Sequence, residues 1–194
     1  AMVSGGNDKT IVCASSLAGV RPIDPSRSFL VARYNKDMTL DKGFGENGFF
    51  PVIIGNSRVN LCTSISTYYD GSMLLGIEVG NDFNHLNFTL EHFSSEGIKI
   101  KTFESPLQEL VARSSINFNL EEDYSFVKTS IMQRDGKALI AGIMTSVSSD
   151  SSELFIIRYN IDGSIDRSFG TNGILFFEGV LEGDSKYPLD ILLK

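Results

Sequence analysis

A loop in the C-terminal third of the chain carries oxygen-bearing side chains at a spacing that suits a hard cation. In the segment NIDGSID, Asn160, Asp162 and Asp166 occupy positions one, three and seven, and Gly163 allows a sharp bend. Loops of this composition hold calcium through amide and carboxylate oxygens. A hairpin turn in which Asp162 accepts hydrogen bonds from nearby backbone N–H groups explains the same residues. We expect the turn, and we predict no metal ligand in this loop.

Two arginine residues stand in strand-like segments next to an aromatic residue. On a period-two pattern, Arg33 and Arg158 either face a central channel or pair with the carboxylates of Asp41 and Asp166. The same pairing appears twice in the chain, whereas a residue that serves a functional site has no need to repeat. We therefore predict two structural ion pairs.

One stretch that differs from the rest of the chain concentrates groups capable of acid–base chemistry. Asp82 and His85 lie in the segment NDFNHLN, and Glu91 and His92 follow shortly after. Histidine is the usual general base or metal ligand near neutral pH. These two histidines match no metal-ligand spacing and have no paired nucleophile. The sequence also lacks a Gly-rich phosphate loop, a Gly-x-Ser-x-Gly elbow and a cysteine cluster, so we predict no catalytic, metal-binding or cofactor-binding residue and no cofactor.

Composition limits the classes of partner and the compartment. A net charge of −7 and a pI near 4.8 argue against nucleic-acid binding, because such surfaces concentrate Lys and Arg. The apolar runs are far shorter than the ~20 residues of a spanning helix, which argues against membrane insertion. No signal-peptide pattern opens the sequence, so we expect a cytoplasmic protein or one exported by a route not visible in this chain. Cys13 and Cys62 lie in apolar runs, where we expect buried reduced thiols.

An internal duplication organises the chain. The segment RYNIDGSIDRSFGTNG at 158–173 repeats RYNKDMTLDKGFGENG at 33–48, with nine of sixteen positions identical, which is far beyond what composition gives by chance. A middle copy aligns when Phe93 takes the place of Tyr34 and Tyr159. The steps are 59 (93−34) and 66 (159−93), so the period is close to sixty residues.

Each copy has the pattern of a four-stranded antiparallel meander. Period-two alternation over 61–68 leads into Asp70-Gly71, which predicts a hairpin turn with positive φ at both central residues. One short helix is expected between the second and third copies, with Ser105 as its cap, Pro106 at its first position and Glu109 four residues before Arg113. The first copy opens without a preceding strand, and the tail 187–194 has the pattern of a spare opening strand.

The repeated motifs are similar to those of a known family. An Asp-Gly-Lys turn, an apolar strand with Ala-Gly, an aromatic-Arg-Tyr-Asn strand and a Phe-Gly-x-Asn-Gly loop resemble the bacterial delta-60 repeat. The resemblance covers nearly the whole chain but is weak in the middle copy, where His92 replaces Arg and Ser94 replaces Asn. It implies a β-propeller-like arrangement and transfers no active-site residue.

The predicted architecture is one all-β domain over 1–194, with repeats at 7–58, 59–123 and 124–186 and a closing strand at 187–194. A four-stranded sheet cannot bury both faces alone, and radial stacking of such sheets as propeller blades solves this. Propellers have typically four to eight blades, so three copies do not close a ring. Either the chain is part of a longer array, or two chains form a homodimer of about six blades in which each tail strand 187–193 completes the other chain's first blade. We favour the homodimer.

For function, we expect a non-enzymatic interaction scaffold for a protein or glycan partner, because a propeller presents variable loops on a rigid frame. The alternative is a propeller enzyme, a hydrolase or lyase acting on sugars or lactones in the central channel. That alternative requires acidic and histidine side chains that converge at one end of the channel. A role as a segment of a longer surface array is the third hypothesis.

Overall fold

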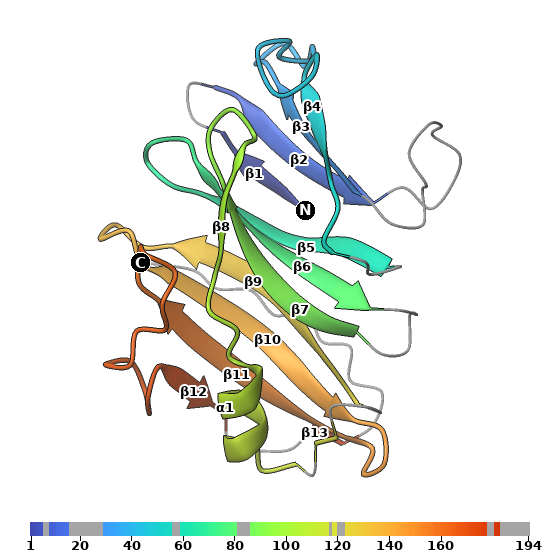
Figure 1. The fold of residues 1–194 in the computed structure, drawn as a ribbon, viewed down its shortest axis with the longest axis vertical. Coiled ribbons are helices and arrows are strands. Elements are labelled where there is room, and N and C mark those ends of the chain that lie inside the picture. Colours follow the sequence, from blue (N-terminus) through green and yellow to red (C-terminus); the bar gives the residue numbers. More distant parts are fainter. Residues whose placement is uncertain are drawn as a thin grey trace.

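Three antiparallel sheets make up the protein, and each follows one copy of the repeat (Figure 1). The structure is a computed structural model and describes residues 1–5, 8–15, 29–55, 59–80, 86–116, 118–119, 123–177 and 181–182. We call the sheets blade 1, blade 2 and blade 3. Blade 1 contains β1 (Met2–Ser4), β2 (Thr10–Ser15), β3 (Phe29–Tyr34) and β4 (Phe49–Val52). Blade 2 contains β5 (Val59–Thr67), β6 (Met73–Gly80), β7 (Leu86–Phe93) and β8 (Lys99–Thr102).

Blade 3 contains β9 (Tyr124–Met132), β10 (Ala138–Ser146), β11 (Ser151–Tyr159) and β12 (Ile174–Phe176), and β13 (Leu181–Glu182) pairs with the other end of β11. In every blade the spatial order of the four strands is their order along the chain. This confirms the predicted all-β fold of meander blades. The described residues form a stack of three blades and no closed ring (Figure 1).

The opening strand of blade 1 is present, contrary to the prediction. Met2, Val3 and Ser4 pair with Val12, Ile11 and Thr10 as the short strand β1. Three residues are too few to show an alternating pattern in the sequence, which is why the strand was not expected. The edge of blade 1 to which the tail strand 187–193 was assigned is thus occupied by β1 along these residues. The tail strand itself, Asp82 and His85 lie outside the described residues.

Two hydrophobic cores separate the blades, and β6 contributes to both of them. Met73, Leu75 and Ile77 face the core between blades 1 and 2, whereas Leu74 faces the core between blades 2 and 3. All four side chains are fully buried. Blade 2 therefore has an apolar neighbour on each face, and this explains why β6 is a continuous apolar run rather than an alternating one.

The hairpin after β5 differs from the predicted turn. Only Gly71 has a positive φ, of 81°. The Asp70 carboxylate accepts a hydrogen bond from the Ser72 backbone N–H at 2.9 Å, and the Gly71 N–H donates to the Tyr68 carbonyl at 3.0 Å. These bonds describe a three-residue loop with glycine at its left-handed position, and such a loop leaves Asp70 in an ordinary conformation. Gly136 takes the same conformation in blade 3, with a φ of 82°.

The predicted helix is α1 (Leu107–Arg113), and its contacts attach it to blade 3. Pro106 is the N-cap and makes no side-chain capping bond, so the predicted cap at Ser105 and the predicted first position of Pro106 are both wrong by one residue. Glu109 pairs with Arg167 at 3.2 Å, and Arg113 donates to the carbonyl of Thr171 rather than pairing with Glu109. Leu110 is fully buried in the core between blades 2 and 3. None of the helices in the described residues has the length and hydrophobicity needed to span a membrane.

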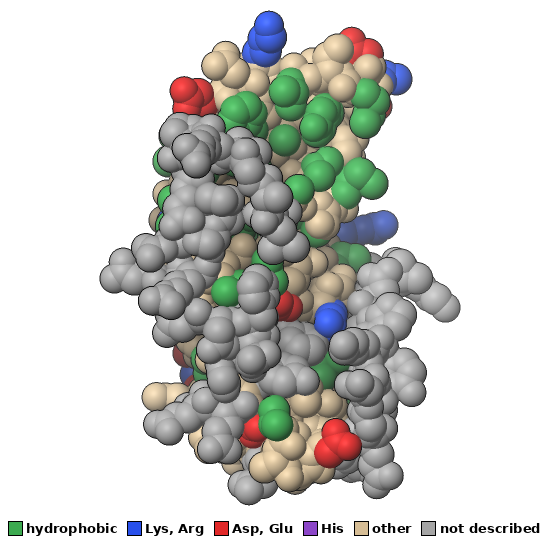
Figure 2. Space-filling model, turned by 90° about the vertical axis from the view of Figure 1, so that its right-hand side faces the viewer, with side chains coloured by type: hydrophobic (Ala, Val, Ile, Leu, Met, Phe, Trp, Pro, Cys, Tyr) green, Lys and Arg blue, Asp and Glu red, His purple; other side chains and the backbone are tan. Residues whose placement is uncertain are grey.

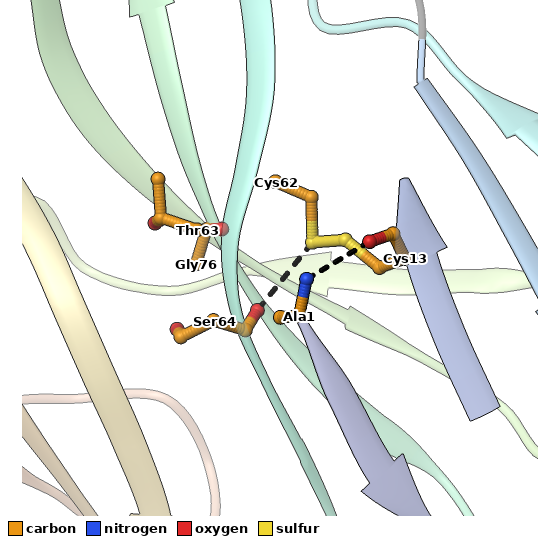
Figure 3. Close-up of a disulfide and its surroundings, with 6 residues drawn as sticks. All are labelled: Ala1, Cys13, Cys62, Thr63, Ser64 and Gly76. Carbon is orange, nitrogen blue, oxygen red and sulfur yellow. Dashed lines mark hydrogen bonds between the residues drawn. A yellow bond between two sulfur atoms is a disulfide. The ribbon is translucent and has the colours of Figure 1, made fainter. Parts of the chain in front are cut away.

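A disulfide connects blade 1 to blade 2, and the prediction of reduced thiols is wrong. Figure 3 shows Cys13 of β2 and Cys62 of β5 joined through their sulfur atoms. Their Cα atoms are 6.1 Å apart, within the range of natural disulfides. The stacking of the blades brings together two strands that are separated by 49 residues along the chain. Such a contact cannot be read from the apolar runs in which the cysteines lie.

Candidate functional site

The repeated arginines belong to a partly buried cluster of three charges. In blade 1 the Asp41 carboxylate accepts hydrogen bonds from the Nε of Arg33 at 2.7 Å and from the Nζ of Lys9. In blade 3 Asp166 accepts from the Nε of Arg158 and from the Nζ of Lys137, both at 2.7 Å. The predicted ion pairs are confirmed. The lysine of the cluster was not predicted, although in blade 3 it is the last residue of the Asp-Gly-Lys turn that leads into the second strand.

Both carboxylates are held in their ionised form. The Lys9 ammonium, with a further contribution from the Arg33 guanidinium, lowers the pKa of Asp41 to about 2. The Lys137 ammonium and the Ser168 hydroxyl hold the pKa of Asp166 well below its usual range. A carboxylate that two cations fix in place at neutral pH has no proton to donate and is a poor base. The clusters therefore stabilise the blades, and their carboxylates stay ionised at neutral pH.

The loop after each aspartate completes the structural role of the cluster. The Arg33 guanidinium lies 4.4 Å from the centre of the Phe44 ring, and that of Arg158 lies 4.8 Å from the centre of the Phe169 ring. The peptide N–H of Arg158 also donates to the carbonyl of Gly173 at 3.1 Å. The phenylalanine of the Phe-Gly-x-Asn-Gly motif thus packs on the arginine side chain, and this contact explains why the motif recurs in both copies.

Blade 2 replaces the charged cluster with a neutral pair. Ser72 stands in the place of the lysine and His92 in the place of the arginine, and their Oγ and Nε2 atoms are 3.0 Å apart. The Ser72 hydroxyl lies 2.6 Å from the Asp70 carboxylate and donates to it. The segment that carries the aspartate is six residues shorter in blade 2, since His92 to Phe103 spans 11 residues and Arg33 to Phe50 spans 17. Lysine, arginine and aspartate were replaced together, so no buried charge is left unpaired.

The histidine of this pair is not placed as an accessible base. His92 is buried, with its ring 4.8 Å from that of Tyr68 and edge-on to Phe103. Burial, with a smaller contribution from the Lys101 charge, lowers the pKa of His92, which favours the neutral imidazole. Glu91 is bound to Lys99 at 2.8 Å and to the Thr102 hydroxyl. The described members of the divergent stretch thus have partners of their own.

The candidate cation loop is a hairpin turn, as predicted. The Asp162 carboxylate accepts from the backbone N–H of Ser164 at 3.0 Å and from its hydroxyl at 2.6 Å. These two bonds lower the pKa of Asp162. Gly163 supplies the left-handed residue, with a φ of 84°. The Asp162 carboxylate thus serves the local turn, whereas the Asp166 carboxylate binds the Arg158 and Lys137 side chains.

A groove opens where the first turns of the three blades meet. Its volume is about 480 Å³, and its walls include Ser4 and Gly5 of blade 1, Tyr69 of blade 2 and Gln133 and Gly136 of blade 3. The opening strands lie side by side in the stack, with β5 between β1 and β9. The groove is therefore at one end of the axis around which the blades are arranged. Sequence reasoning missed it because its walls come from three turns that are about sixty residues apart.

Among the described residues, the lining of the groove is aromatic and polar, with one carboxylate. Tyr69 is 83% exposed, the highest value among the large hydrophobic side chains of the described residues. Burial raises the pKa of its neighbour Tyr68 to about 12, so that this phenol stays neutral. The described residues that line the groove include Asp70 and no lysine or arginine. This arrangement suits a neutral ligand with a flat apolar face.

Comparison with known proteins supports the repeat and does not identify an activity. A family model with the description "Domain of unknown function (DUF5122) beta-propeller" matches residues 133–169. The matched segment holds Lys137, Arg158 and Asp166, which form the charged cluster of blade 3. No curated protein matches the chain. The chain thus carries a β-propeller-like repeat that is similar to this family.

Proposed function

We propose that the protein is a non-enzymatic binding scaffold and that its axial groove binds a neutral glycan. The observation that carries the proposal is the exposed ring of Tyr69, which stands on a groove built by all three blades. Propellers present loops on a rigid frame, and a ligand at the axis contacts several blades at once. The family match to a β-propeller domain supports a scaffold in general.

The choice of a glycan follows from the side chains around the groove. An aromatic face packs against the C–H face of a sugar ring, and nearby hydroxyl and carbonyl groups bind the sugar hydroxyls. Ser4, Thr67 and Gln133 supply such polar groups. Asp70 has a lowered pKa because the Ser72 hydroxyl and N–H bond to it, so it is ionised and repels an anionic ligand.

Catalysis receives no support from the described residues. The enzyme alternative requires acidic and histidine side chains that converge on the groove, and His92 instead lies buried against Tyr68. The carboxylates with a strongly lowered pKa, Asp41 and Asp166, belong to clusters that recur in two blades. Burial raises the pKa of Glu78 to about 6, but Glu78 is not among the described residues that line the groove. We infer further that the copies are delta-60 repeats, because the Asp-Gly-Lys turn and the Phe-Gly-x-Asn-Gly loop frame the matched segment.

Glycan binding is tested with neutral polysaccharides. The purified protein is applied to immobilised β-glucan, α-glucan, xylan and galactan. An oligosaccharide of the polysaccharide that retains the protein is then titrated into the protein by calorimetry. We expect one of the four polysaccharides to retain the protein. We expect Tyr69→Ala to weaken binding at least about tenfold because the stacking surface is lost. The matched control is Ile98→Ala, an exposed apolar residue on another turn of blade 2. Unchanged binding by Tyr69→Ala, or no retention on any of the four, overturns the proposal.

A further inference from the structure

Two consecutive positions from each blade line the groove at the axis of the stack. The first position is the last residue of each opening strand, and we call these residues the first ring: Ser4, Thr67 and Met132. The second position is the next residue along the chain, and we call these residues the second ring: Gly5, Tyr68 and Gln133. In the second ring each backbone N–H donates at 2.8 Å to the carbonyl four residues further on. The three blades therefore bring the same turn position to one groove.

The first ring contains a hydrogen bond that joins two blades. The Thr67 hydroxyl of blade 2 donates to the carbonyl of Ser4 in blade 1 at 3.0 Å. Met132 has no hydrogen-bonding group of this kind and packs against the core between blades 2 and 3. The hydroxyl of Thr67 is thus already used to hold the blades together.

The second ring differs from blade to blade, and two of its polar atoms are unused. A Cβ atom on Gly5 would be 2.9 Å from the Ile11 side chain, so blade 1 contributes no side chain here. The hydroxyl oxygen of Tyr68 and the Oε1 atom of Gln133 are both buried, and neither has a hydrogen-bond partner among the described residues. Unpaired buried oxygens cost free energy and are rare in folded proteins. The same position thus provides an open side at blade 1 and two unpaired oxygens at blades 2 and 3.

These two oxygens complement each other chemically. Burial raises the pKa of Tyr68 to about 12, so the phenol keeps its proton and can donate it in a hydrogen bond. The amide oxygen of Gln133 can only accept. A ligand hydroxyl can do both, whereas a carboxylate has no proton to donate and is repelled by the ionised Asp70.

The groove differs in this respect from the surface at the upper end of the molecule. Figure 2 shows hydrophobic side chains gathered there. In the groove, an exposed aromatic ring, that of Tyr69, is combined with a hydrogen-bond donor and an acceptor. This combination distinguishes a polar ligand with an apolar face from a purely apolar one.

We propose that Tyr68 and Gln133 are the specificity-determining side chains of the groove, and that they bind hydroxyl groups of a sugar ring that packs on Tyr69. The Tyr68 hydroxyl donates to one sugar oxygen, and the Gln133 carbonyl oxygen accepts from a sugar hydroxyl. Both side chains are half-buried, and a small rotation presents their oxygens to the groove. The ring of the sugar then lies toward blades 2 and 3, and the rest of the glycan leaves past Gly5. This inference rests on the proposed binding of a neutral glycan.

Unfolding of the protein without ligand tests whether the Tyr68 hydroxyl is free. Tyr68→Phe keeps the ring and removes only an oxygen that has no partner, so we expect its urea midpoint to be equal to that of the wild type or higher. The matched control is Tyr159→Phe, because the Tyr159 hydroxyl donates to the carbonyl of Glu104 at 3.2 Å. We expect this control to lower the midpoint. A lower midpoint for Tyr68→Phe shows that the hydroxyl serves a buried water only, and it overturns the inference.

Calorimetry tests the contact with the sugar. The probe is the oligosaccharide of whichever of β-glucan, α-glucan, xylan and galactan retains the wild type. Tyr68→Phe and Gln133→Met, which preserve side-chain size, are each expected to weaken binding about three- to tenfold. Tyr159→Phe is expected to bind as the wild type does, since Tyr159 is not among the described residues that line the groove.

Deoxy forms of the same oligosaccharide, each lacking one hydroxyl, identify the group that is bound. We expect one deoxy form to bind the wild type about three- to tenfold more weakly, and to show no such additional loss with Tyr68→Phe or with Gln133→Met. If the wild type binds the oligosaccharide and both variants bind it equally well, this inference alone is wrong. If none of the four polysaccharides retains the wild type, the proposed function is wrong and this inference is overturned with it.

Discussion

At the scale of single residues, the copies show which side chains depend on one another. Lys9, Arg33 and Asp41 occur together in blade 1, and their counterparts occur together in blade 3. Blade 2 has replaced all three positions, with Ser72 and His92 as a neutral hydrogen-bonded pair. A buried carboxylate with one cation removed, or a cation with the carboxylate removed, carries an uncompensated charge. The cluster is therefore retained or lost as a unit.

Acid titration of Asp41 gives the first prediction. Its folded pKa of about 2 is below the ordinary value of 3.8, so its ionisation stabilises the folded state above about pH 4. That stabilisation is lost as the pH falls from about 4 to about 2. We expect Asp41→Asn to lower the free energy of unfolding by about 1 to 3 kcal/mol at pH 7 and to have a much smaller effect near pH 2. Urea unfolding at a series of pH values measures the difference.

The control for this series is Asp150→Asn, which changes an exposed turn residue. It is expected to leave the free energy of unfolding nearly unchanged at every pH. If the difference in free energy of unfolding between wild type and Asp41→Asn stays constant from pH 7 to pH 2, the loss of stability is steric and the ion pairs are not its cause.

At the scale of elements, the disulfide between β2 and β5 adds a covalent link to the apolar core between blades 1 and 2, to which both cysteines belong. It closes a loop with a sequence separation of 49 residues, and constraining an unfolded chain of that length contributes about 2 to 4 kcal/mol. We expect reduction, or Cys13→Ser combined with Cys62→Ser, to lower the free energy of unfolding by this amount. Chemical denaturation with and without a reductant measures it. The double serine variant is the control, because the reductant is expected to leave its stability unchanged.

Sequence patterns predicted the elements well where they were long and repeated. The nine-residue strands and the Arg33–Asp41 pair followed from alternation and from duplication. The short strand β1 was missed because Met2–Ser4 is too brief to show a period. The Cys13–Cys62 bond and the axial groove were missed for a different reason. Both depend on how blades stack, and contacts between blades join residues far apart in the chain.

At the scale of the whole molecule, protection from solvent is greatest in the middle of the stack. Strand β6 has buried side chains on both of its faces, because Met73 and Leu75 face one core and Leu74 faces the other. Blades 1 and 3 each have one face without a neighbouring blade among the described residues. The middle blade is consequently the part of the fold that opens last.

Hydrogen exchange measures this order. We expect the backbone amides of Met73–Gly80 to exchange most slowly, and those of Phe49–Val52 and Ile174–Phe176 to exchange much faster, because β4 and β12 are edge strands of the outer blades. Leu74→Ala serves as the matched perturbation. It creates a cavity beside β6 and is expected to lower the free energy of unfolding by about 2 to 5 kcal/mol, which speeds exchange there. Equal protection in all three blades would contradict this order.

The covalent link between Cys13 and Cys62 also sets how the molecule responds to mechanical force. When the chain is stretched from its two termini, the segment between the cysteines stays slack and bears no load until the bond is reduced. About 49 residues, or roughly 170 Å of extended chain, therefore do not contribute to the extension of the chain. The boundary between blades 2 and 3 has no such tether among the described residues, so rupture starts there.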